Sequence, residues 1–214
     1  MKPVYWFGHS TFRLLGKLFF SYRVHQRDRL IEEGPCLIAS NHVSFLDPPM
    51  VGIAFDKEIY YLARKTLFKK GFFNWLYRSW NSIPVDQEGA DFSGLKAIIR
   101  KLKEGERVLI FPEGARSWDG KISDAQAGTG LVIEKSGAPV LPVRLFGTWE
   151  ALPRGSGRLK LSKISVVIGD PVDFSAVREE GLKGRELYQR LSDHTMAAIA
   201  ALELPEDGSS RSES

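Results

Sequence analysis

Two apolar segments of this chain each end at a polar turn, and this pattern constrains the fold more than any other feature. Segment 35–39 (PCLIA) runs into a turn that contains His42 and Asp47, and segment 107–111 (RVLIF) runs into a turn that begins at Pro112. Short apolar runs bounded by turn residues predict buried strands. Helical sequence between them favours parallel strands, whose carboxyl ends meet at one edge of a sheet. We therefore expect both turns to line the same crevice.

The rest of the chain predicts an α/β fold. Strands are expected at 59–63, 81–85, 139–146 and 160–168, and helices at 49–55, 91–103, 128–135 and 184–203. Strands that alternate with helices at this rhythm indicate a single domain with a largely parallel mixed sheet flanked by helices. In this interpretation all strands of the sheet begin after Gly34.

The first turn places a base beside a carboxylate. Four residues separate His42 from Asp47, and Asp47-Pro48 is typical of a helix start. The chain can fold back so that the Asp47 carboxylate accepts the Nδ1 proton of His42, which leaves Nε2 as a free base. Spacing alone favours a plainer interpretation, a helix cap beside a polar strand end.

The second turn favours catalysis, because the two turns together resemble known motifs. Asn41-His42-x4-Asp47-Pro48 and the segment 111–117 (FPEGARS) are similar to the first and third motifs of the glycerolipid acyltransferases, typified by 1-acylglycerol-3-phosphate acyltransferase. The segment 140–143 (VLPV) is similar to the fourth. The resemblance covers about residues 30 to 175, and three motifs in order are a specific signal.

This resemblance implies an O-acyltransferase of phospholipid synthesis. It would move a fatty acyl group from acyl-CoA or acyl carrier protein, as co-substrate, to the free hydroxyl of a lysophosphatidic-acid-like acceptor. His42 would be the general base and Asp47 would hold its imidazole, in a direct transfer without an acyl-enzyme. The implied acceptor-binding residues are Lys65, Glu113, Gly114, Arg116 and Ser117. The implied substrate-pocket residues are Asn41 and Pro142.

Arg116 is the expected ligand of the acceptor's phosphate, because a guanidinium can donate two parallel hydrogen bonds to it. The structural alternative is an ion pair with Glu113 or Asp119. Glu113 is expected to orient Arg116 or a substrate hydroxyl, and Gly114 is expected to let the backbone approach the ligand closely.

The second motif departs from the family pattern. Gln87 follows the segment 83–86 (IPVD) where a basic residue is usual. Arg64 or Lys65 could supply the missing charge. Otherwise the acceptor could be a different lysolipid, such as a lysophospholipid or an amino-acid lipid.

Two other classes of function stay open. One is a non-catalytic lipid- or nucleic-acid-binding module with the same fold, which would have no need for all of the motif residues. The other is a hydrolase that uses Cys36 or Ser44, although no Gly-x-Ser-x-Gly elbow surrounds the serine. We expect no metal or other cofactor, because the four histidines have no ligand-like spacing. A single cysteine excludes a disulfide framework.

Basic and aromatic residues are concentrated together in two regions. Residues 1–27 and 60–80 contain no acidic residue, yet they hold 15 of the 24 aromatic residues. Leu and Phe among the charges, as in segment 14–20 (LLGKLFF), favour a lipid surface over nucleic acid. The alternative is an ordinary amphipathic helix that packs its apolar face into the core. Near the N-terminus the longest uncharged run has ten residues, half of what a membrane span of ~20 requires.

These patterns divide the chain into three parts. Residues 1–29 are expected to be an amphipathic membrane-associating segment, 30–203 the acyltransferase domain, and 204–214 a disordered polar tail. The expected location is peripheral or monotopic, on the cytoplasmic face of a membrane. The expected partners are the lipid surface, the acyl donor and a lysophospholipid acceptor, and no nucleic acid.

Overall fold

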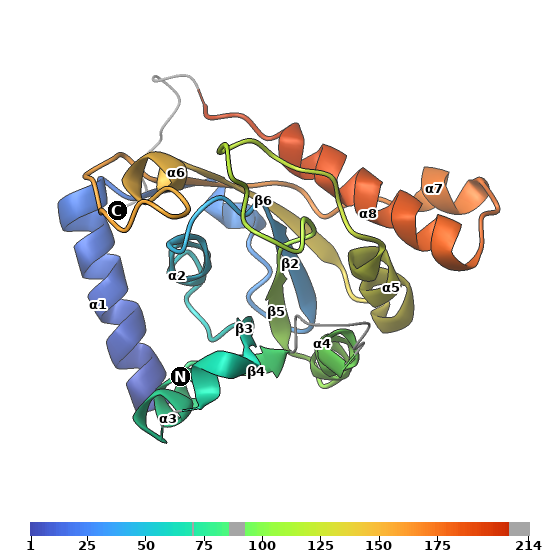
Figure 1. Cartoon of the computed structure of the whole chain (residues 1–214). Coiled ribbons are helices and arrows are strands. Elements are labelled where there is room, and N and C mark those ends of the chain that lie inside the picture. Colours follow the sequence, from blue (N-terminus) through green and yellow to red (C-terminus); the bar gives the residue numbers. More distant parts are fainter. Residues whose placement is uncertain (70, 86–92, 206–214) are drawn as a thin grey trace.

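A five-stranded mixed sheet forms the centre of the computed structural model, which describes residues 1–69, 71–85 and 93–205 (Figure 1). Its strand order is β1 (Arg23–His25), β7 (Ser165–Ile168), β6 (Val140–Phe146), β2 (Cys36–Ser40) and β5 (Arg107–Ile110). The β2 strand is parallel to both β5 and β6, whereas β6 and β7 are antiparallel. The α/β fold with a largely parallel mixed sheet is therefore confirmed.

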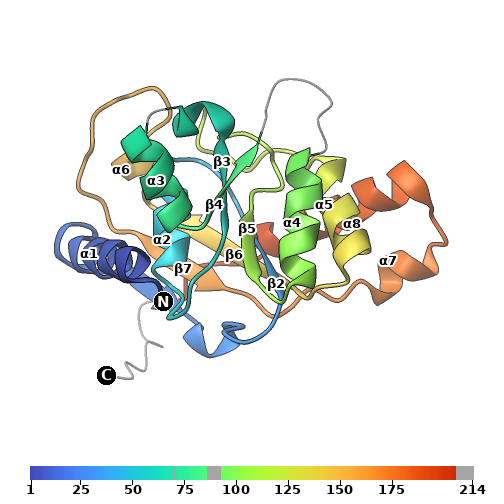
Figure 2. The ribbon, with the colours of Figure 1, turned by 90° about the horizontal axis from the view of Figure 1, so that it is seen from below.

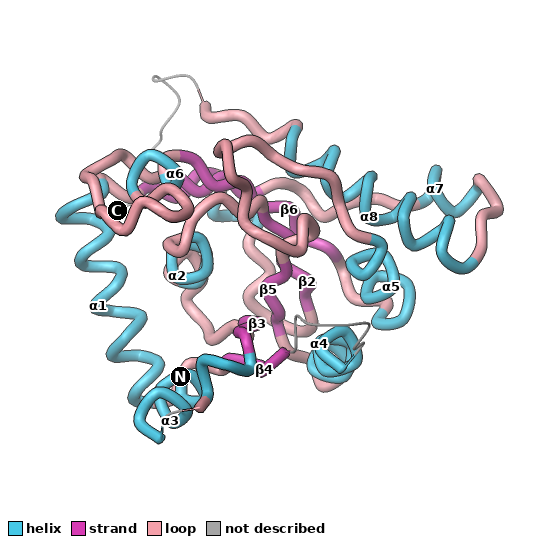
Figure 3. Tube along the Cα trace, viewed as in Figure 1, coloured by secondary structure: helices cyan, strands magenta, loops and turns pink. Residues whose placement is uncertain are grey.

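Helices cover both faces of this sheet. Figures 1 and 2 show α1 (Pro3–Phe20) and α2 (Asp47–Gly52) on one side, and α4 (Ser93–Lys103), α5 (Ala127–Ser136) and α8 (Gly184–Ala200) on the other. The shorter helices α3 (Gly71–Ser79), α6 (Thr148–Ala151) and α7 (Ser175–Glu179) lie at the periphery (Figure 3). Two 3₁₀ turns, η1 (Arg27–Arg29) and η2 (Lys65–Phe68), complete the described elements.

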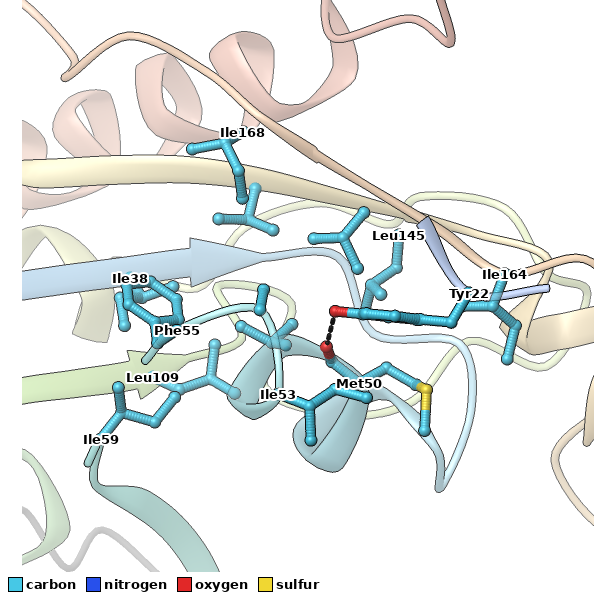
Figure 4. Close-up of a cluster of buried hydrophobic side chains, with 14 of the residues drawn as sticks. Tyr22, Ile38, Met50, Ile53, Phe55, Ile59, Leu109, Leu145, Ile164 and Ile168 are labelled. Carbon is cyan, nitrogen blue, oxygen red and sulfur yellow. Dashed lines mark hydrogen bonds between the residues drawn. The ribbon is translucent and has the colours of Figure 1, made fainter. Parts of the chain in front are cut away.

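Each face of the sheet has its own apolar core, because successive side chains of a strand point to opposite sides. Cys36 and Ile38 of β2 pack with the α2 side, whereas Leu37 and Ala39 pack with α4, α5 and α8. Figure 4 shows the first of these clusters, in which the buried Tyr22 hydroxyl donates a 2.7 Å hydrogen bond to the carbonyl of Met50. The two cores hold β2 rigidly, and the catalytic candidates follow directly from its end.

The predicted strands at 59–63 and 81–85 form, but outside the main sheet. They correspond to β3 (Tyr61–Arg64) and β4 (Ser82–Val85), which pair in parallel as a separate two-stranded sheet. A bridge at Tyr60 links this ribbon to β5, since its N–H lies 2.8 Å from the carbonyl oxygen of Arg107. The ribbon therefore extends from the main sheet beside the polar turns.

The expectation that every strand begins after Gly34 is wrong. The β1 strand at Arg23–His25 pairs in parallel with β7, at the edge of the sheet. Just before it, Phe20 and Tyr22 are buried in the core, and α1 buries Tyr5 and His9. Part of the segment that was assigned wholly to a membrane surface is thus integral to the domain.

Other predicted bounds differ at their ends. The strand predicted at 160–168 is limited to β7, and residues 160–164 form no strand. The helix predicted at 91–103 is described from Ser93 onward, and Gln87 lies outside the described residues, as does the polar tail from 206 onward. Among the described helices, none has the length and apolarity that a membrane crossing needs.

Candidate active site

The two polar turns meet at one edge of the sheet, as their sequence pattern predicts. In the register of β2 and β5, Ala39 lies opposite Ile110, so both chains leave the sheet side by side. The imidazole of His42 stacks on the ring of Phe111 with centroids 3.8 Å apart and planes 12° apart. The N–H of Ser117 donates a 2.9 Å hydrogen bond to the carbonyl of His42. The turns form one unit around the imidazole.

Asp47 holds the imidazole from the buried side. One carboxylate oxygen, Oδ2, accepts hydrogen bonds from His42 Nδ1 at 2.8 Å and from the N–H groups of Val43 and Ser44 at 2.6 and 2.7 Å. Asp47 begins α2, where the helix dipole favours a negative charge, and it is fully buried. Its other oxygen, Oδ1, is buried with no hydrogen-bond partner among the described residues. With its Nδ1 proton donated to Asp47, His42 presents Nε2 as a proton acceptor.

Glu113 holds the first turn through backbone hydrogen bonds and does not bond Arg116, the expected phosphate-binding residue. Its Oε1 accepts a 2.6 Å hydrogen bond from the N–H of His42, and its Oε2 accepts a 2.9 Å bond from the N–H of Ser123. Burial raises the pKa of this carboxyl, while the two N–H groups act in the opposite direction. Of the two expected roles of Glu113, orienting Arg116 is wrong, since its oxygens bind the backbone N–H groups of His42 and Ser123. Orienting a substrate hydroxyl stays a prediction, and the described cavity lining does not include Glu113.

A cavity of about 820 Å³ lies beside the imidazole. Both turns contribute to its lining, through His42 and Gly114, and so do residues of α1, β3 and α4. Gly114 has a φ of 73°, a left-handed conformation that favours glycine. Much of the wall is apolar, and its apolar residues include Phe12, Leu62, Leu67, Leu95, Ile98 and Ile110. The cavity joins a candidate base to a space that suits a hydrocarbon chain.

Three arginines line the same cavity: Arg64, Arg116 and Arg154. The guanidinium of Arg116 lies 3.3 Å from the ring centre of Phe45, and its Nη1 is buried with no hydrogen-bond partner among the described residues. Burial lowers the pKa of Arg116, and the positive charges of Arg154 and Arg64 lower it further. In the described chain no ion pair involves Arg116, so the alternative of a structural pair with Glu113 or Asp119 is not what the structure contains.

Three residues expected at the substrate lie elsewhere. Lys65 begins η2, and the described lining includes its neighbour Arg64 instead. Asn41 is buried, and its side chain bonds both backbone groups of Leu145, which ties the end of β2 to β6. Pro142 is buried inside β6 and paired with Ala39 of β2. Asn41 and Pro142 brace the sheet behind the site, and the described cavity lining includes neither.

Two further residues have structural roles in the turns. Ser117 is buried, and its hydroxyl donates a 2.8 Å hydrogen bond to Asp119, which closes the second turn. The hydroxyl of Ser44 donates a 2.8 Å bond to the carbonyl of Leu152, and Ser44 is fully buried.

The two nucleophiles considered for a hydrolase are both inaccessible. Ser44 is engaged in the turn, as above. Cys36 is fully buried at the start of β2, and burial raises the pKa of its thiol to about 12. A thiol with that pKa is almost entirely protonated near neutral pH and is a poor nucleophile.

Comparison with known proteins identifies the family. The family model described as Acyltransferase matches residues 21–145, more than half of the chain. A chloroplastic 1-acyl-sn-glycerol-3-phosphate acyltransferase from Brassica napus is 30% identical over 141 residues, which are 64% of this chain and 41% of that protein. A 1-acyl-sn-glycerol-3-phosphate acyltransferase from Bacillus subtilis is 26% identical over 170 residues, 79% of this chain and 82% of that one.

A solved structure gives the same result. The crystal structure of the 1-acyl-sn-glycerophosphate acyltransferase PlsC from Thermotoga maritima is similar with a TM-score of 0.69 and 27% identity, and the match covers 92% of this chain and 76% of that one. The match with the Brassica napus protein spans about two fifths of that relative's length. With both motif turns at one crevice and a family model that spans β1 to β6, this chain belongs to the acyltransferase family.

Proposed function

We propose that this protein is a membrane-surface O-acyltransferase that esterifies the free hydroxyl of a lysophosphatidic-acid-like acceptor, with acyl-CoA or acyl carrier protein as donor. The observation that carries the proposal is the His42–Asp47 pair, held at 2.8 Å beside a partly apolar cavity that three arginines also line. The names of the relatives above support acyl transfer to a 1-acylglycerol-3-phosphate acceptor, and they say nothing of the donor or of a membrane. A lipid-binding module would have no use for a buried carboxylate that fixes one tautomer of an imidazole at the cavity wall.

The proposed reaction needs no covalent enzyme intermediate. His42 Nε2 removes the proton of the acceptor hydroxyl as its oxygen attacks the thioester carbonyl. The charge of Asp47 stabilises the imidazolium that forms. The carbon–sulfur bond then breaks, and the thiol leaves with the proton that His42 held. Glu113 keeps the His42 backbone in place during these steps through its hydrogen bond to the N–H.

A direct assay tests this proposal. The purified protein would be incubated with labelled acyl-CoA, or with labelled acyl carrier protein, and a panel of lysolipids, and the diacylated products identified. We expect lysophosphatidic acid to be the best acceptor, because the arginines beside the cavity suit a phosphate monoester. Preference for another lysolipid would favour the alternative acceptors. Release of free fatty acid with no diacylated product would instead favour a hydrolase.

The Arg116→Ala substitution is expected to weaken acceptor binding selectively. Loss of a charge-assisted hydrogen bond of ~1.5–3 kcal/mol corresponds to a rise of about 10- to 150-fold in KM. That rise should appear for lysophosphatidic acid and shrink for a monoacylglycerol, which has no phosphate. Steady-state kinetics with both acceptors would measure it. An equal rise in KM for both acceptors would show that Arg116 does not bind the phosphate.

The proposed membrane contact rests on exposed apolar side chains. The outer face of α1 exposes Trp6, Phe7, Leu14, Leu15, Leu18 and Phe19, and α3 exposes Phe72 and Trp75. Both helices lie on the same side of the domain in Figures 1 and 2. Basic residues beside these side chains suit the anionic lipids of a cytoplasmic leaflet. We therefore place the enzyme on that face of a membrane, as a monotopic protein.

Deleting residues 1–27 is not a clean test of this contact, because the deletion would also remove β1 and the buried Phe20 and Tyr22. A triple substitution on one stripe of α1 is better: Phe7→Gln, Leu14→Gln and Leu18→Gln. Each side chain is more than half exposed, so the fold should survive. If each contributes ~1.5 kcal/mol or more in the lipid, binding to anionic vesicles should fall at least about 1,000-fold.

Co-sedimentation with anionic vesicles would measure this binding, with circular dichroism as the test of folding. The matched control is Leu204→Gln, an exposed leucine that follows α8. High salt should weaken wild-type binding only in part, since screening leaves the apolar contribution. Unchanged binding of the folded triple variant would mean that α1 is not the membrane contact.

A further inference from the structure

The guanidinium of Arg154 lies at the candidate active site although no motif contains it. It is contributed by the loop that follows α6, where Pro153 forms an isolated bridge with Ser44 of the first turn. Arg154 lines the cavity that His42 and Arg116 also line. The main sheet therefore brings a cation from a third segment of the chain to the two motif turns.

Two contacts hold the Arg154 side chain in place. Its guanidinium lies 3.7 Å from the ring centre of Trp118, in a cation–π contact. Its Nη1 donates a hydrogen bond to the backbone carbonyl of Arg116. An arginine that hung freely in solvent would have neither contact. The remaining donors of the guanidinium are left for a ligand, because the fork carries five N–H groups.

The charges around this position are unbalanced. Burial lowers the pKa of Arg116 most, the positive charges of Arg154 and Arg64 lower it further, and the charge of Asp47 acts in the opposite direction with a smaller effect. Within the described residues, neither Arg116 nor Arg154 forms an ion pair with a carboxylate. The buried Nη1 of Arg116 also has no hydrogen-bond partner there. Two guanidinium groups at one cavity, one of them with a buried donor that has no described partner, suit a ligand that carries two negative charges.

We propose that Arg154 is a second phosphate-binding residue of the acceptor site, and that Arg116 and Arg154 together select a phosphate monoester. This proposal rests on the proposed function. A monoester carries about −1.5 to −2 charges near pH 7 and presents three oxygens, enough for two guanidinium forks. A phosphodiester carries a single charge and has a bulky substituent on one of those oxygens. The pair therefore favours lysophosphatidic acid over lysophosphatidylcholine.

The test compares R154Q with R154K and with R158Q. Arg158 lies on the same loop, is exposed and is not among the described residues that line the cavity. For R154Q we expect KM for lysophosphatidic acid to rise about 10-fold, with little change for lysophosphatidylcholine or for the acyl donor. R154K should recover part of the loss, because it keeps the charge without the fork. R158Q should behave as wild type.

Binding of sn-glycerol 3-phosphate by titration calorimetry separates this proposal from the proposed function. Because this measurement needs no turnover, it tests phosphate binding by Arg154 even if no acceptor in the panel is acylated. R154Q should bind the probe about 10-fold more weakly than wild type and R158Q, with circular dichroism showing all three folded. Binding that R154Q leaves unchanged, or no binding to wild type, would overturn the proposal. So would a rise in KM for the donor alone, which would assign Arg154 to the phosphates of the donor.

Discussion

Replacing His42 with alanine is expected to reduce kcat by ~10²–10⁴-fold while the protein remains folded. Two described imidazoles line the cavity, and of these His42 is the one whose Nδ1 bonds a carboxylate, whereas His9 bonds the backbone carbonyl of Phe55. The His42 side chain is 17% exposed and packs against Phe111, so its removal costs some contact but leaves Asp47 bonded to two backbone N–H groups. The loss should therefore be catalytic.

Release of CoA from acyl-CoA, followed with a thiol reagent, would measure this loss. The protein's own Cys36 is fully buried and should react little in a folded sample. His194→Ala is the matched control, because His194 bonds the carbonyl of Asp173 on the α8 side of the domain. Near-wild-type turnover of the folded His42→Ala protein would show that another group is the base.

Local patterns were enough to predict that His42 and Asp47 meet, whereas their catalytic role was expected only from the resemblance to the acyltransferase motifs. His42 and Asp47 are five positions apart, so the turn between them sets their hydrogen bond with little help from the rest of the fold. The same holds for the two buried strands that precede the turns, since β2 and β5 are apolar runs with polar ends. Their parallel pairing then follows from the general preference for helical crossovers.

Features that depend on distant pairing could not be predicted in the same way. The β1 strand at Arg23–His25 has no apolar run, and it exists because β7 lies beside it, some 140 residues later in the chain. Apolar patterning also does not say which strands pair. The sequence therefore predicted the strands β3 and β4 but not that they form a sheet of their own. Glu113 was expected to orient Arg116 or a substrate hydroxyl, yet its hydrogen-bond partners are backbone groups of His42 and Ser123.

Arg154 illustrates the same limit at the level of function. It stands in a loop rich in glycine, with no motif that marks it, and its position depends on the contact with Trp118. Asn41 and Pro142 are the opposite case, because they were expected in the substrate pocket and lie outside the described cavity lining. Both belong to recognisable motifs, but their contacts join β2 to β6 behind the site and do not form the wall of the cavity.

Replacing Asp47 with asparagine is expected to lower kcat by ~10²–10⁴-fold, with the turn largely intact. All three donors converge on Oδ2, so an asparagine can place its carbonyl oxygen there and accept the same hydrogen bonds. Its NH₂ then takes the place of Oδ1, a buried atom that has no described partner. The Nδ1 tautomer of His42 would be kept, and the lost quantity is the negative charge that stabilises the imidazolium.

The comparison with Asp47→Ala separates charge from geometry. Alanine leaves the N–H groups of Val43 and Ser44 buried without an acceptor, at a cost of about 1–3 kcal/mol for each group. Thermal unfolding should therefore show Asp47→Ala to be clearly less stable than Asp47→Asn, whereas turnover should be low in both. If the folded asparagine variant kept near-wild-type kcat, the carboxylate would be a structural anchor of the turn, and the charge of Asp47 would have no part in the transfer.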